Sequence, residues 1–165
     1  MLSKIKTLWI MGIIMITLVI GFCGCAPDDI DISGYADSEI TITGAGGDDV
    51  SVSVAELKEM DCISVKTEST SDKIGKVKAT GPTLDTVFEN KGINLEDVAK
   101  ITFHGTDDYE YSLQDDYIAE HDIILAFGID GEPLNEEDAP CRIIIPESDS
   151  AYWLRMLDRI DVEMK

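Results

Sequence analysis

Histidine and cysteine, the side chains that most often bind transition metals, are few in this sequence. The 165 residues include 2 histidines and 4 cysteines. His104 follows an apolar run, so it is a candidate ligand or base, with a capping or core role as the alternative. His121 lies among acidic residues, where we expect contact with solvent. Neither histidine lies at zinc-site spacing from Cys62 or Cys141, so no zinc site is predicted.

Acidic side chains form three short clusters. Such clusters can bind calcium with millimolar affinity outside the cell, which makes an acidic calcium-binding surface module one possible function. None of the clusters has the spaced ligands of a calcium loop, and no serine has an identifiable base that would make it a nucleophile. The clusters are Asp107-Asp108-Tyr109-Glu110, Asp115-Asp116 and Glu136-Glu137-Asp138.

The beginning of the chain has the pattern of an export signal. Lys4 and Lys6 precede an apolar run at residues 8–22, which as a helix is about 22 Å long and therefore short for a bilayer. The stretch Phe22-Cys23-Gly24-Cys25 resembles the lipobox of bacterial lipoproteins, in which a small residue precedes the cysteine. We predict a signal peptide at residues 1–24 and a lipid anchor on Cys25. A plain membrane anchor is the alternative.

The predicted signal peptide and lipid anchor divide the chain into three parts. Residues 25–38 are expected to form a lipidated tether, and residues 39–165 are long enough for one domain with a core of its own. The anchor would hold the domain on the outer face of the bacterial cytoplasmic membrane. The signal lacks an Arg-Arg pair, so we expect export by the general route, in which the chain crosses unfolded.

Charge limits the choice of partners. The whole chain has a net charge of −20, and removal of Lys4 and Lys6 with the signal leaves −22. Such a surface repels nucleic acid, so we predict no nucleic-acid partner. A protein or small-molecule partner remains unidentified.

Hydrophobic periodicity predicts a mostly β domain with short helices, which is the α+β class. Strands are expected at residues 40–43, 50–54, 62–67, 100–104, 109–113, 123–129, 141–145 and 159–162. Short helices are expected at 53–60, 83–92 and 114–120, with a capped turn at 94–99. The polar segment 68–80 is expected to be a loop that a break at Gly81-Pro82 ends. Cys62 and Cys141 fall in strands, where they form either a disulfide or two buried free thiols.

Several short sequence segments occur in an order that indicates one family. Residues 123–146 read IILAFGIDGEPLNEEDAPCRIIIP, residues 101–113 read ITFHGTDDYEYSL, and residues 152–162 read YWLRMLDRIDV. The first is similar to LLAYxMNGEPLPxxHGxPxRLVVP of the molybdopterin-binding domain of the sulfite oxidase family. The other two resemble that family's hairpin and its last strand. The resemblance covers about residues 39–165 and implies an α+β domain on a mixed, barrel-like β sheet.

The resemblance also implies where a cofactor would lie. In the family a cysteine thiolate after the third strand binds molybdenum, a metal suited to a soft ligand. The matching stretch, residues 65–71, has no cysteine and offers only Ser69 and Ser71. Glu137-Asp138 replaces the family's histidine. Candidates for holding the pterin are Lys73, Lys76, Lys78, His104 and Arg142. The alternatives are solvated lysines and, for Arg142, an ion pair with an acid.

Three functions remain open at this level. The missing cysteine and the export of an unfolded chain favour a lipoprotein that has lost the metal ligand, carries no cofactor and acts as a binding or interaction module without catalysis. A molybdopterin-dependent oxidoreductase with a non-cysteine ligand is the second, and the calcium-binding module is the third.

Overall fold

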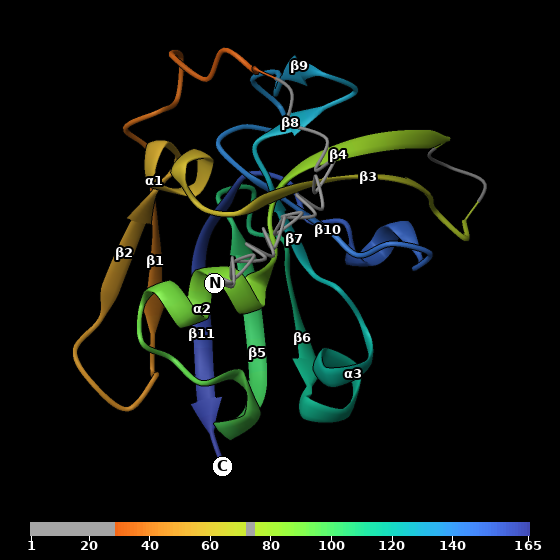
Figure 1. Ribbon diagram of the computed structural model, residues 1–165. Coiled ribbons are helices and arrows are strands. Elements are labelled where there is room, and N and C mark those ends of the chain that lie inside the picture. Colours follow the sequence, from red (N-terminus) through yellow and green to blue (C-terminus); the bar gives the residue numbers. More distant parts are fainter. Residues whose placement is uncertain (1–28, 72–74) are drawn as a thin grey trace, which may run out of the picture.

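The computed structural model describes residues 29–71 and 75–165 (Figure 1). The signal peptide, Cys25 and Lys73 lie outside these residues, so the expectations for them stay predictions. No helix in the described part of the chain is both long enough and apolar enough to cross a membrane.

The largest sheet has five strands in the order β2-β1-β11-β5-β6. Strands β1 and β11 run parallel, whereas the other neighbours run antiparallel. This sheet therefore joins the first and last strands of the described domain. Its strands are β1 (Glu39–Thr43), β2 (Val50–Ser53), β5 (Val98–Gly105), β6 (Glu110–Gln114) and β11 (Leu157–Met164).

The remaining strands form two smaller antiparallel sheets. One has the order β3-β4-β8-β9, and the other pairs β7 with β10. The described strands thus lie in three sheets that do not close into a barrel, so the barrel-like sheet expected from the sequence is wrong while the α+β class is confirmed. The strands are β3 (Cys62–Glu68), β4 (Lys76–Pro82), β7 (Ile124–Ala126), β8 (Gly128–Ile129), β9 (Glu132–Pro133) and β10 (Arg142–Ile144).

Short capped helices connect the strands. Ser53 and Glu56 form a capping box at the start of α1 (Val54–Glu59), and Thr83 caps α2 (Leu84–Asn90). Helix α3 (Asp115–Glu120) follows β6, as the sequence predicts. Two 3₁₀ turns, η1 (Leu95–Asp97) and η2 (Ser150–Tyr152), complete the set.

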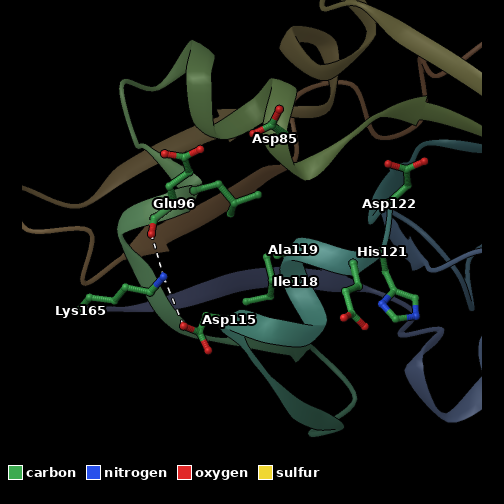
Figure 2. Close-up of a pocket in the computed structure, with 10 residues that line it drawn as sticks. Asp85, Glu96, Asp115, Ile118, Ala119, His121, Asp122 and Lys165 are labelled. Carbon is green, nitrogen blue, oxygen red and sulfur yellow. Dashed lines mark hydrogen bonds and ion pairs between the residues drawn. The ribbon is translucent and has the colours of Figure 1, made fainter.

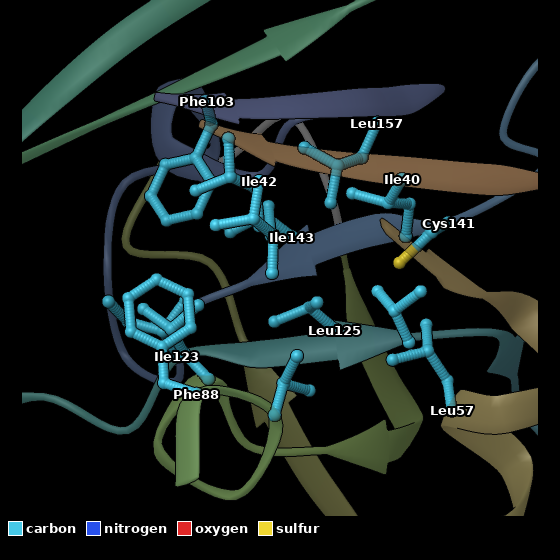
Figure 3. Packing of buried hydrophobic residues seen from close by; sticks show 14 of the residues in the cluster. Ile40, Ile42, Leu57, Phe88, Phe103, Ile123, Leu125, Cys141, Ile143 and Leu157 are labelled. Carbon is cyan, nitrogen blue, oxygen red and sulfur yellow. The ribbon is translucent and has the colours of Figure 1, made fainter. Parts of the chain in front are cut away.

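The β7–β10 pair lies between two hydrophobic clusters. Successive strand residues point to opposite faces, so Leu125 and Ile143 enter the main core, which Figure 3 shows. Ile124 and Ile144 point the other way, into a smaller cluster that also contains Trp153. Both faces of this pair are therefore apolar, which explains the near-continuous apolar runs in its sequence.

Strand β4 is the main departure from the expected elements. The polar segment after β3 was expected to be a loop, yet its second half is a strand that continues through Gly81 and Pro82. A side chain at Gly81 would collide with the backbone of Leu125, because β4 passes close to β7 there. Strand β4 pairs with the preceding strand β3 and with β8, so its strand character comes from these partners and not from its own polar residues.

The expected tether is packed on the domain. Ile30 and Ile32 are 1% and 7% exposed. The Tyr35 hydroxyl donates to the Phe127 carbonyl and accepts from the Leu134 amide, both at 2.8 Å. Residues 29–38 therefore belong to the folded domain, and the boundary expected at residue 39 is too late.

This packing gives a test of the domain boundary. Ile30→Ala should lower the free energy of unfolding by about 2–4 kcal/mol, because it leaves a cavity in the main core. Urea denaturation measures the change. Ser33→Ala, at an exposed position of the same segment, is the control and should change stability by less than about 0.5 kcal/mol. Equal, negligible effects of both variants would mean that the segment is a free tether.

Candidate functional site

The loop after β3 is held by a chain of hydroxyl groups. Ser69 is 7% exposed, and its Oγ lies 3.0 Å from Ser71 Oγ and accepts from the Ser71 amide at 3.1 Å. Ser71 Oγ lies 2.6 Å from Ser150 Oγ, in η2. The two serines predicted as alternative ligands are therefore engaged in fastening this loop to η2.

Lys76 and Lys78, at the start of β4, line an open cavity of about 800 Å³ together with Ser69. The cavity lies where β3 ends and β4 begins, and Asp130 and Glu147 form part of its wall. The structure thus brings together three of the residues that the family resemblance singles out. Antiparallel pairing of β3 and β4 places them there.

Arg142 does not line that cavity. Its side chain in β10 is 10% exposed, and its Nη1 lies 3.3 Å from Asp138 Oδ1. Burial lowers the pKa of the Arg142 guanidinium, the Asp138 carboxylate raises it, and Arg155 lowers it further. The ion pair with an acid exists, yet among the described residues Arg142 Nε is buried with no hydrogen-bond partner. This orphaned donor suits an anionic group.

His104 lies in β5 of the five-stranded sheet, away from the serines and lysines. Its Nε2 is 2.8 Å from Asp161 Oδ2, and its Nδ1 is 2.9 Å from Glu110 Oε2. Asp161 also accepts from the Thr43 hydroxyl at 2.9 Å. His104 is therefore part of a polar row across β1, β11, β5 and β6.

The two thiols of the domain are free. Cys62 Sγ donates to the Leu57 carbonyl at 3.3 Å, and burial, with a smaller effect of Asp61, raises the pKa of this thiol to about 11. Cys141 is fully buried, and burial raises its pKa further. Cys62 lies at the start of β3 and Cys141 is enclosed in the main core, and neither lines the cavity at the end of β3. The structure corresponds to two free thiols, the second of the two arrangements that the sequence left open.

An acidic pocket lies between α2, η1 and α3 (Figure 2). It has a volume of about 460 Å³, and His121 lies on its wall, stacked on Tyr117 with ring centroids 3.9 Å apart. Lys165 Nζ binds Asp115 Oδ2 at 3.2 Å and the Glu96 carbonyl at 2.9 Å. No sequence pattern indicates this pocket, because its acids come from separate elements with no common spacing.

The described residues do not assemble a metal centre. Across residues 29–71 and 75–165, no group of three or more histidine, cysteine or acidic side chains is placed to hold an ion. Asp115 reaches the acidic pocket, whereas the other two acid clusters predicted for calcium do not line it.

Comparison with known proteins identifies the family. The model of the oxidoreductase molybdopterin binding domain matches residues 27–165, so the chain belongs to this family. Among solved structures, the chain is similar to the sulfane dehydrogenase SoxCD from Paracoccus pantotrophus, with a TM-score of 0.65 and 16% sequence identity. The match covers 79% of this chain and 39% of that one, so the chain spans well under half of the SoxCD chain. A search of curated proteins finds no match.

The family binds molybdopterin, and the donor set of this chain fits that cofactor only in part. Arg142 has a spare buried donor, as an anionic group requires. The serine after β3 has its hydroxyl engaged with Ser71, and neither thiol lines the cavity there.

The thiol environments predict slow alkylation. At pH 8 Cys62 should react with iodoacetamide about a hundredfold more slowly than an unperturbed thiol, because a raised pKa lowers the thiolate fraction. Cys141 should react more slowly still. Peptide mass spectrometry of the native protein measures both rates, and the same protein in urea is the control. Rapid native labelling of Cys62, or a Cys62–Cys141 cross-linked peptide, would contradict the structure.

Proposed function

We propose that this protein is a membrane-anchored, extracytoplasmic binding module built on a molybdopterin-binding-type domain that no longer carries the metal. The observation that supports this is the donor set after β3. Ser69 lies in the stretch where the family has its cysteine, and its hydroxyl is hydrogen-bonded to the Ser71 hydroxyl. A neutral, hydrogen-bonded serine is a poor ligand for molybdenum compared with a thiolate.

The thiols elsewhere do not substitute for the missing ligand. Cys62 lies at the start of β3, seven residues before Ser69, and Cys141 is enclosed in the main core. Moving Cys62 to the end of the strand would require a large shift of the β3–β4 register, which seven paired positions fix. The predicted export signal supports the same proposal, because a chain that crosses the membrane unfolded would not retain a cofactor loaded beforehand.

Elemental analysis tests the loss of the metal. We expect the lipoprotein, purified in detergent from its native host, to contain far less than one molybdenum or tungsten per chain and no pterin fluorescence. A family member with the cysteine, purified in parallel, is the positive control. About one metal per chain would overturn the proposal in favour of the oxidoreductase, and Ser69→Ala and Cys62→Ala would then identify the ligand.

Anchoring through Cys25 has its own test. Cells that express the protein and are fed an alkyne-tagged fatty acid should label the wild-type chain, and the mature protein should remain in the membrane fraction. Cys25→Ser should abolish labelling, since the thiol is the acceptor of the diacylglyceryl group. Cys23→Ser is the matched control and should label normally. Labelling that persists in Cys25→Ser would exclude this anchor.

A further inference from the structure

The acidic pocket between α2, η1 and α3 continues into a recess of about 110 Å³, where the start of α2 meets the start of β7. The Leu84 amide donates to the Ile123 carbonyl at 2.7 Å. Thr83 forms a β-bridge with Ile124, so the backbone around the recess is fixed from both sides. The recess therefore has a preformed apolar lining, as small-molecule sites commonly do. Its apolar walls are formed by Leu84, Leu95, Ile118 and Ile123.

The pocket at the mouth of this recess has a large excess of negative charge. Five of the described residues that line it are acidic, and one, Lys165, is a lysine. Lys165 forms an ion pair with Asp115. Among the described residues, the carboxylates of Asp85, Glu120 and Asp122 have no hydrogen bond or ion pair. The mouth is therefore complementary to a cation.

One end of the pocket already holds an ammonium group. Lys165 Nζ lies 3.2 Å from Asp115 Oδ2 and donates to the Glu96 carbonyl at 2.9 Å, as Figure 2 shows. A metal ion is a poorer match, because across residues 29–71 and 75–165 no three acidic, histidine or cysteine groups are placed to share one ion. An ammonium group has three separate donors and can use acceptors that are spread apart.

Acceptors also lie where the pocket joins the recess. Asp85, Asp122 and His121 line both parts. His121 Nδ1 donates to the Tyr117 carbonyl at 3.0 Å, which leaves Nε2 of the neutral ring as an acceptor. The Tyr117 ring stacks on the imidazole at 3.9 Å and holds it in place. Two carboxylates and one ring nitrogen therefore lie next to the point where the apolar walls begin.

We propose that the pocket and the recess together bind a small primary alkylammonium ion, with the alkyl chain in the recess and the ammonium group beside Asp85 and Asp122. The apolar walls are innermost and the carboxylates are at the mouth, so the ligand enters with its chain first. A lysine side chain of a partner protein would enter with its ammonium group first, toward the apolar walls, and fits poorly.

This inference goes beyond the proposed function. The pocket and the recess share no lining residue with the cavity at the end of β3, where the family resemblance places the cofactor. Amine binding therefore does not depend on whether the chain carries a metal.

Thermal unfolding of the full mature lipoprotein in detergent tests the site. Adding n-butylammonium chloride to about 10 mM at constant ionic strength should raise the Tm by about 3 °C and then saturate. Butanol, which has the same chain without the charge, should not raise the Tm. From methylammonium to butylammonium the affinity should rise about fourfold for each methylene group, because each is transferred from water into the recess.

A pair of variants locates the site. Asp122→Asn should weaken butylammonium binding about tenfold, because it removes a charged acceptor at the junction. Asp108→Asn is the matched control and should respond as the wild type does, since Asp108 is exposed in the turn between β5 and β6 and lines neither the pocket nor the recess. No response of the wild type, an equal response to butanol, or an equal response in Asp122→Asn would overturn the proposal.

A lysine derivative distinguishes a free amine from a partner's side chain. Nα-acetyl-lysine amide should leave the Tm unchanged, and a shift as large as that with butylammonium would overturn the assignment to a free amine. None of these results bears on the metal content, which elemental analysis measures independently.

Discussion

The short antiparallel ladder between β7 and β10 is the interaction on which the rest of the domain depends. Its three paired positions are buried, and each face packs against a different hydrophobic cluster. Because unpaired backbone groups would be costly in such surroundings, the ladder fixes where both strands lie. The β3–β4 hairpin follows from it, since the Phe127 amide, just after β7, donates to the Thr80 carbonyl at 3.0 Å. The cavity at the far end of that hairpin is thus positioned from the core.

The same ladder explains the position of Arg142. The residues on either side of it along β10, Cys141 and Ile143, enter the main core, so the Arg142 side chain points to the opposite face. There it meets Asp138 but leaves one donor unused. A buried guanidinium with a spare donor is a costly arrangement for stability alone. The spare donor suits an anionic group, in a domain whose family binds molybdopterin.

Much of this fold could be predicted from the sequence where local signals were strong. The capping box at Ser53 and the cap at Thr83 placed α1 and α2, and alternation placed β1, β2 and β3. Strand β4 escaped prediction because its lysines and glycine read as a loop, and its strand character comes from pairing with β3 and β8. The packing of Ile30 and Ile32 was also not predicted, because the acidic and glycine residues around them resemble a linker.

The candidate site was predictable only in part. The family resemblance singled out Ser69, Lys76 and Lys78, which line one cavity, and also His104, which the structure places in a different sheet. The sequence did not indicate that Lys66 lies opposite Lys78 across the strand pair. Such a relation depends on register, which a single sequence specifies poorly.

With the lipid anchor that we propose on Cys25, the burial of Ile30 would limit how far the domain can lie from the membrane. Five backbone steps separate the two residues, and a fully extended chain advances at most about 3.6 Å per residue, so the span is at most about 18 Å. A domain held so close to the membrane by a short segment could not tumble freely, and it would present a restricted set of faces to the periplasm or cell exterior. Binding would then become an encounter in a thin layer at the membrane, where ligands or partners are met largely in two dimensions.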